Sequence, residues 1–332
     1  MKAMGYLQAH DLKHFAIREM EVPLPVLGEE DVLVCIKAIS INPVDYKIRS
    51  TKSGSPDHPI ILGWDAAGIV EKVGNSVRDF VVNDEVFYAG SLLKDGANSA
   101  YHVVDHRLIA KKPKNLSFAQ SASLPLTSLT AWEALIERHY FEYTPSTKIL
   151  IIGAAGGVGS AAIQILKAVT PATIIATASR PETVDWCQKM GADIIIDHTK
   201  DLATELKSHQ IDQVDLVLGT NHSQNYVNII PNLLRPFGYF CLIDDPKTLD
   251  IVSFKQKSLS VHWEFMFTKS VFNFNMQSQG EILQKIAKLV ESQKMRSTEN
   301  LVLEGLSVEN LKDAHHLLEA KGSIGKIVIT LA

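Results

Sequence analysis

Cysteine is scarce in this sequence, which has three in 332 residues: Cys35, Cys187 and Cys241. They lie far apart and are odd in number, so they supply neither a disulfide framework nor a paired CxxC metal site. We therefore expect small, buried, reduced thiols in a reducing compartment.

Neither sign of charge dominates, and long hydrophobic runs are missing. The chain has 33 lysines and arginines against 37 aspartates and glutamates, for a net charge of -4. This balance offers no basic surface for nucleic acid and no polybasic membrane patch. The opening stretch MKAMGYLQAHDLKHF contains no apolar signal region, and no later run reaches the length of a membrane span. We expect a cytoplasmic protein that binds neither nucleic acid nor membrane.

The pattern of predicted strands and helices changes along the chain, which fits two domains. From Met1 to about Pro125, short β-type runs are broken by turn residues, which predicts a β-rich module. From Lys148 onward strands and helices alternate, which predicts a doubly wound α/β domain with a parallel sheet. Two amphipathic helices, near residues 281–293 and 308–320, precede a closing strand, GKIVIT.

A glycine-rich turn separates two apolar runs in KILIIGAAGGVGSAAIQIL, residues 148–166. It follows a predicted buried strand and opens a predicted helix, the place where dinucleotide-binding proteins hold a pyrophosphate on backbone NH groups. Gly156 and Gly157 would allow that approach, and Gly159 would allow close helix packing, although the spacing departs from GxGxxG. The alternative is a glycine-rich turn without a ligand. The predicted cofactor-binding residues of the turn are Gly153, Ala154, Ala155, Gly156, Gly157, Val158 and Gly159.

The end of the second predicted strand bears on the choice of cofactor. An acidic residue about 20 positions after the glycines would accept hydrogen bonds from the ribose of NAD. Here the sequence reads TIIATASRPE, so Ser179 and Arg180 stand in that place. A guanidinium with a hydroxyl suits a 2′-phosphate, which predicts NADP(H). The alternative is a solvated Arg180 with Glu182 as the ribose acceptor.

Several motifs resemble those of the medium-chain dehydrogenase/reductase superfamily, in the family's order. They are ISINPVDYKIR, LGWDAAGIVEKVG, LPLTSLTAWEAL, GAAGGVG, KMGAD and GKIVIT. The similarity is greatest to the zinc-independent quinone oxidoreductase branch. It implies a GroES-like catalytic domain at 1–125, completed by 265–332, and a Rossmann NADP(H)-binding domain at 126–264. It also implies a homodimer.

The same resemblance raises the question of zinc, because alcohol-oxidising members of the superfamily hold a catalytic zinc. Such a site needs three protein ligands around an open position. In this chain Trp64 replaces the histidine of the family's GHE segment, Asp65 is the remaining acid, and the cysteine position falls within NPVD. The last ligand position offers Thr127 or its apolar neighbours. We therefore expect no metal, with a zinc-dependent alcohol dehydrogenase as the alternative.

Without a metal, side chains or solvent must stabilise the negative charge that hydride transfer leaves on the substrate oxygen. NPVDYKIR resembles the NPxDxK signature of ene and quinone reductases, which implies that Lys47 polarises the carbonyl. Tyr46 is a second donor candidate, although alternation along an extended chain would point it away from Lys47. Asn42 and Asp45 could orient the lysine or the nicotinamide. Alternatively, Asp45 caps a local turn and Lys47 is a solvated charge.

Further cofactor contacts are implied by the resemblance alone. They are Thr127, Thr130, Thr220, Asn221, Ile243 and Lys326. Asp65 could pair with Lys47 or belong to a buried hydrogen-bond network. Together these features predict a reductase that passes hydride from NADPH to a small quinone or α,β-unsaturated carbonyl. The alternative from another class is an NADPH-binding protein with little turnover.

Overall fold

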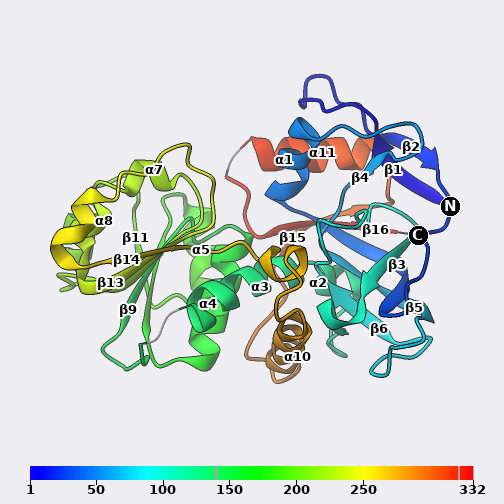
Figure 1. Ribbon diagram of the computed structural model, residues 1–332. Coiled ribbons are helices and arrows are strands. Elements are labelled where there is room, and N and C mark those ends of the chain that lie inside the picture. Colours follow the sequence, from blue (N-terminus) through cyan, green and yellow to red (C-terminus); the bar gives the residue numbers. More distant parts are fainter. Residues whose placement is uncertain (139–140, 321, 332) are drawn as a thin grey trace. The chain divides into compact units, whose positions relative to one another are not determined.

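The computed structural model describes residues 1–138, 141–320 and 322–331. The chain divides into two compact units (Figure 1), and each is described by itself. Unit 1 comprises Met1–Leu129 and Phe267–Ala332, and unit 2 comprises Thr130–Met266. Unit 1 is therefore discontinuous in sequence, whereas unit 2 is one continuous stretch.

Unit 1 is built around a seven-stranded sheet whose central strand, β3 (Asp31–Ile41), pairs with β16, β5 and β7. The β-branched residues of DVLVCIKAISI favour an extended chain, and most of them are buried. A smaller sheet has the order β2-β1-β4. The other strands are β1 (Lys2–Tyr6), β2 (Arg18–Glu21), β4 (Ile60–Ile61), β5 (Ala66–Val73), β6 (Glu85–Tyr88), β7 (Tyr101–Asp105), β8 (Ile109–Lys111), β15 (Glu299–Glu304) and β16 (Lys326–Thr330).

Unit 1 contains more helix than the β-rich prediction allowed. The segment PVDYKIRST forms helix α1 (Pro43–Thr51), because Asn42 precedes Pro43 at the first helical position and Asp45 closes the first turn. The two predicted amphipathic helices are confirmed as α10 (Gln277–Glu291) and α11 (Val308–Glu319). The others are η1 (His106–Leu108), α2 (Phe118–Ala122), α9 (Thr268–Val271) and α3 (Pro125–Trp132), which runs from unit 1 into unit 2.

Unit 2 contains a six-stranded, fully parallel sheet in the order β11-β10-β9-β12-β13-β14. Numbered from the first strand of the unit, this order is 3-2-1-4-5-6, the doubly wound arrangement of dinucleotide-binding domains. The predicted α/β fold is thereby confirmed. The strands are β9 (Lys148–Ile152), β10 (Thr173–Thr177), β11 (Ile194–Ile196), β12 (Val214–Gly219), β13 (Leu234–Leu242) and β14 (Ser260–Trp263).

The central strands β9, β10 and β12 are buried on both faces of the sheet, which explains why they read as continuous apolar runs. On one face Leu150 and Ile152 of β9 join a core with Leu206, Ile230 and Phe240. On β9 the alternate side chains are also fully buried. The helices are η2 (Glu133–Glu137), α4 (Gly157–Val169), α5 (Pro181–Met190), α6 (Leu202–Ser208), α7 (Ser223–Tyr226), α8 (Ile230–Leu233) and η3 (Val252–Lys257).

Candidate functional site

The glycine turn joins β9 to α4, and two of its glycines have conformations or contacts that exclude a side chain. Gly153 has φ +77°, and a Cβ added there would lie 2.2 Å from Thr220 Oγ1. A Cβ on Gly159 would lie 2.4 Å from the carbonyl oxygen of Ala154. These contacts give a physical reason for glycine at each position.

Gly156 differs from the other two, because space is available around it. It is the residue immediately before α4, and the atom nearest to a Cβ added there would be the Gly153 oxygen at 3.5 Å. The amino end of α4 is therefore left without a covering side chain at that point, as an anion site on a helix N-terminus requires. Of the other predicted residues, Ala154 and Ala155 are buried, and Gly157 and Val158 are half-buried.

Three further predicted cofactor residues lie in unit 2 at the carboxyl ends of β12, which is next to β9, and of β13, which is next to β12. Thr220 and Asn221 follow β12, and Ile243 follows β13. Thr220 donates from its backbone N–H and from Oγ1 to the Ile152 carbonyl, over 3.1 and 2.9 Å. The Ile243 N–H donates to the Gly219 carbonyl over 3.2 Å. The structure thus brings these residues together with Gly153 where the strand order reverses, the usual place for a ligand in such a sheet.

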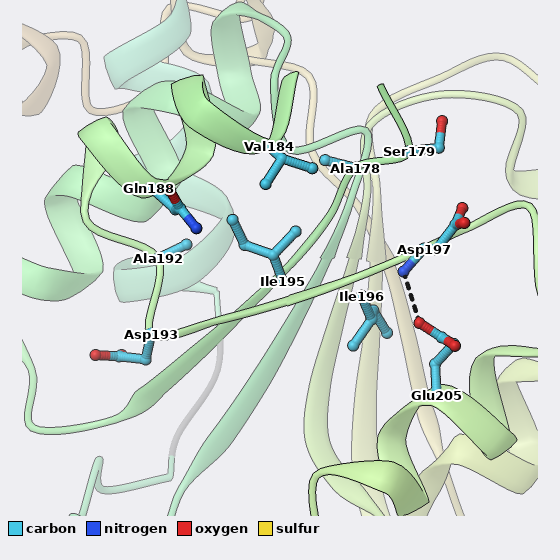
Figure 2. Close-up of a pocket in the computed structure, with 10 residues that line it drawn as sticks. All are labelled: Ala178, Ser179, Val184, Gln188, Ala192, Asp193, Ile195, Ile196, Asp197 and Glu205. Carbon is cyan, nitrogen blue, oxygen red and sulfur yellow. Dashed lines mark hydrogen bonds between the residues drawn. The ribbon is translucent and has the colours of Figure 1, made fainter. Parts of the chain in front are cut away.

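Ser179 lies at the rim of a pocket of about 370 Å³ at the edge of the same sheet. Figure 2 shows Ile195 of β11 pointing toward Val184 and Ile196 pointing away from it, so the pocket runs along this edge strand. Asp197 and Glu205 line it as well, and the Asp197 N–H donates to Glu205 Oε2 over 3.0 Å.

Arg180 directly follows Ser179 and precedes α5. Its backbone N–H donates to Thr183 Oγ1 over 3.1 Å, which fixes the start of the helix. Its side chain is 48% exposed, and Nε lies 3.3 Å from Glu182 Oε1. Exposed ion pairs of this kind are worth little, so an incoming phosphate could compete for the guanidinium. The same pairing occupies Glu182, the alternative ribose acceptor.

The candidates of unit 1 begin with Asp45, which is fully buried in the first turn of α1. Its Oδ2 accepts from the Asn42 N–H over 2.7 Å, and its Oδ1 accepts from the Gly63 N–H over 2.9 Å. Burial raises the pKa of Asp45 to about 7. The carboxyl therefore caps α1 and ties it to the chain at Gly63, which matches the local-cap alternative.

Tyr46 and Lys47 occupy the middle of α1, where Tyr46 is half-buried and Lys47 is exposed. The expectation that they point to opposite sides was wrong, because it assumed an extended chain. Successive residues on a helix are about 100° apart, so both side chains can serve one side of α1.

Lys326 is buried at the start of β16, with 4% of its surface exposed, and it forms an ion pair with Asp65. Its Nζ lies 3.0 Å from Asp65 Oδ2, donates to the Ile41 carbonyl over 2.9 Å and also contacts Asn42 Oδ1. Of the two alternatives for Asp65, the structure has the buried network. Sequence reasoning missed this pairing because 261 positions separate its two members.

The same network decides whether zinc fits at Asp65. One oxygen of this carboxylate accepts from the Leu126 N–H over 2.7 Å, and the other accepts from Asn42 Nδ2 over 2.8 Å and contacts Lys326. The indole N–H of the adjoining Trp64 donates to the Ser91 carbonyl. No three His, Cys, Asp or Glu side chains form a metal-binding group in the described part of the chain. These donors do not fit a tetrahedral zinc site.

The two threonines of α3 complete the predicted set. Thr127 is buried in unit 1, and its Oγ1 donates to the Leu124 carbonyl over 3.2 Å. Thr130 is also buried and belongs to unit 2. Within residues 1–138, 141–320 and 322–331, no helix is both long and apolar enough to cross a bilayer.

Known proteins match this chain along its whole length. Residues 28–114 match the Alcohol dehydrogenase GroES-like domain, and residues 190–329 match the Zinc-binding dehydrogenase family. A Staphylococcus aureus (strain MRSA252) protein named Zinc-type alcohol dehydrogenase-like protein is 39% identical, over 100% of both chains. An NADPH-dependent alkenal/one oxidoreductase of Arabidopsis thaliana chloroplasts is 31% identical, over 94% of this chain and 75% of that one.

Solved structures extend the similarity to the fold. A Rhizobium etli protein named for a zinc-dependent alcohol dehydrogenase is 43% identical, with a TM-score of 0.95, over 99% of this chain and 98% of that one. The quinone oxidoreductase of Coxiella burnetii is 27% identical, with a TM-score of 0.81, over 100% of this chain and 99% of that one. The chain therefore belongs to the medium-chain dehydrogenase/reductase superfamily of oxidoreductases, in its quinone oxidoreductase-like branch.

Proposed function

We propose that this protein is a zinc-independent reductase that uses NADPH to reduce small quinones or α,β-unsaturated carbonyl compounds. The observation that carries the proposal is the pairing of an open glycine turn at Gly156 with Ser179 and Arg180 after the neighbouring strand. The names of similar proteins, an NADPH-dependent alkenal/one oxidoreductase and a quinone oxidoreductase, agree with it.

The residues of unit 2 fit a dinucleotide phosphate. Backbone N–H groups at the start of α4 would hold the pyrophosphate, and Ser179 with Arg180 would hold the 2′-phosphate. Thr220, Asn221 and Ile243 would line the nicotinamide end. When bound, NADPH supplies a hydride to an electron-poor carbon of the acceptor.

The chemistry left to the protein is stabilisation of the oxygen that becomes negative, followed by its protonation. Lys47 and Tyr46 on α1 are the proposed donors. In this proposal Asn42 and Asp45 hold α1 in place. Both are buried, and their hydrogen bonds fix the start of the helix. Lys326, whose ammonium is paired with Asp65 and contacts Asn42, helps to hold the start of α1. Zinc independence rests on the occupied oxygens of Asp65.

The proposed domain assignment places the catalytic domain at 1–125 with 265–332 and the NADP(H)-binding domain at 126–264. A cytoplasmic homodimer completes the proposal. Light scattering would give a mass near twice that of the 332-residue chain if the dimer forms.

The test combines binding with turnover. NADPH and NADH are titrated into purified protein, and oxidation of the one that binds is followed with quinones, enones and simple aldehydes. We expect preference for NADPH, turnover of quinones or enones, and no loss of activity after chelation. Activity confined to alcohols and aldehydes and abolished by a chelator would instead establish a zinc alcohol dehydrogenase. Tight NADPH binding without turnover would favour a binding protein.

A further inference from the structure

Arg49, in the last turn of α1, is among the largest fully buried side chains of the described chain, with 1% of its surface exposed. A buried guanidinium loses its hydration and is tolerated only when charge and hydrogen bonds compensate. An arginine in this position therefore needs a specific set of partners.

Those partners come from two other parts of unit 1. Nε donates to the His10 carbonyl over 3.2 Å, Nη2 donates to Glu319 Oε1 over 2.7 Å, and Nη1 lies 2.9 Å from His315 Nδ1. The ring of Phe15 lies 5.6 Å from the guanidinium carbon. His315 and Glu319 are four residues apart on α11, so one arginine bridges one face of that helix.

The geometry also fixes the state of the histidine. A guanidinium has only donors, so His315 Nδ1 must accept, and the ring is neutral with its proton on Nε2. Burial, and then the adjacent Arg49, lowers the pKa of His315 to about 3. The contact therefore persists across the ordinary pH range, and Glu319 supplies the compensating negative charge.

Arg49 holds one end of α1, and Asp45 holds the other. Asp45 binds the Gly63 N–H in the first turn, and Arg49 binds α11 in the last turn. Tyr46 and Lys47 lie between these two anchors. A helix of nine residues would be marginal alone, so its position depends on such contacts.

We propose that Arg49 is a positioning residue, which fixes α1 on α11 through His315 and Glu319 and so sets where Tyr46 and Lys47 meet the substrate. This inference rests on the proposed function. It adds to it a buried residue that lies outside the proposed donors and the proposed cofactor contacts. Small displacements of groups that stabilise a reaction can lower a rate by about 100-fold.

The experiment uses substitutions that leave the core filled. Arg49→Lys keeps the charge but cannot reach three acceptors, and His315→Leu removes the acceptor at Nδ1. His315→Asn places an amide oxygen near that acceptor position. His316→Leu, at the adjacent exposed position, is the matched control. For each variant, kcat and KM with an enone or quinone, NADPH affinity, and hydrogen exchange of residues 43–51 are measured.

We expect Arg49→Lys and His315→Leu to lower kcat by about tenfold or more. Exchange of the α1 amides should rise with little change in NADPH affinity. His315→Asn should restore much of kcat, and His316→Leu should match wild type. Faster exchange with unchanged kcat would reduce Arg49 to a stabilising role and overturn the proposal, as would unchanged exchange. If the wild type binds NADPH but reduces no acceptor, the proposed function fails and the positioning role fails with it. The exchange data would then still show whether the anchor exists.

Discussion

The candidate residues of the two units are held in place in different ways. In unit 2 the glycine turn of the candidate site depends on backbone: a left-handed glycine, a close helix–strand contact and strand ends placed by the sheet. In unit 1 the candidate residues lie on a helix held by buried ionisable side chains, namely Asp45, Asp65, Lys326 and Arg49. Backbone sites follow from local sequence, whereas charged networks join residues that are distant in the chain. This difference can be tested by breaking each kind of support.

The largest effect is expected from Lys326→Met. Removing one member of a buried ion pair leaves Asp65 uncompensated and should cost about 3–5 kcal/mol in the free energy of unfolding. Urea denaturation measures the change, with the exposed Lys312→Met as control. A loss below about 1 kcal/mol would show that the pair is not an essential part of unit 1. The double variant Lys326→Met with Asp65→Asn should recover part of the loss.

Asp45 should make stability depend on pH. Its folded pKa, about 7, is above the value in an unfolded chain, so its contribution is full below about pH 4 and is lost as pH rises through 7. The free energy of unfolding of wild type minus that of Asp45→Asn should therefore fall by a few kcal/mol between pH 4 and 8. His315, whose lowered pKa acts in the opposite direction, cancels in this difference. A flat difference would contradict the prediction.

The glycine turn predicts a separation of folding from binding. Gly159→Ala brings a methyl against the Ala154 backbone and should destabilise the protein by about 2 kcal/mol. Gly156→Ala has room and should leave the melting temperature nearly unchanged, yet the methyl should lower NADPH affinity by about tenfold. Calorimetry and cofactor titration on both variants provide the comparison. Equal NADPH affinity in Gly156→Ala and wild type would show that the phosphate does not bind at this turn.

The smallest effect concerns Arg180. Arg180→Ala should weaken NADPH binding by about tenfold, because the guanidinium contact with a phosphate is lost, and should leave NADH binding unchanged. Fluorescence titration with both cofactors measures the ratio, and Lys189→Ala on the same helix is the control. Equal loss for both cofactors would indicate damage to α5 instead of a lost phosphate contact.

Most of the fold could be predicted from the sequence. Apolar runs, glycines and helical periodicity are local properties, and β9, α4 and the alternating elements after them lie where these patterns predicted. The helix over Pro43–Thr51 was missed, because Asn-Pro-Val-Asp also favours a turn, and only its hydrogen bonds to the rest of unit 1 settle the choice. The pairing of Lys326 with Asp65 could not be predicted from the sequence either. A lysine in a strand looks solvated until its partner is known.

The discontinuity of unit 1 has a consequence for how the protein is made. Strand β16 lies next to the central strand β3, and Lys326 neutralises Asp65, so early and late segments need each other. Unit 2 is contiguous in sequence and can fold while the second segment of unit 1, Phe267–Ala332, is still being translated. During that interval Asp65 lacks its ion-pair partner Lys326, and one edge of β3 lacks its neighbouring strand β16. Because synthesis proceeds from the amino terminus, unit 2 can fold before unit 1, which contains the buried ion pair of Asp65 and Lys326.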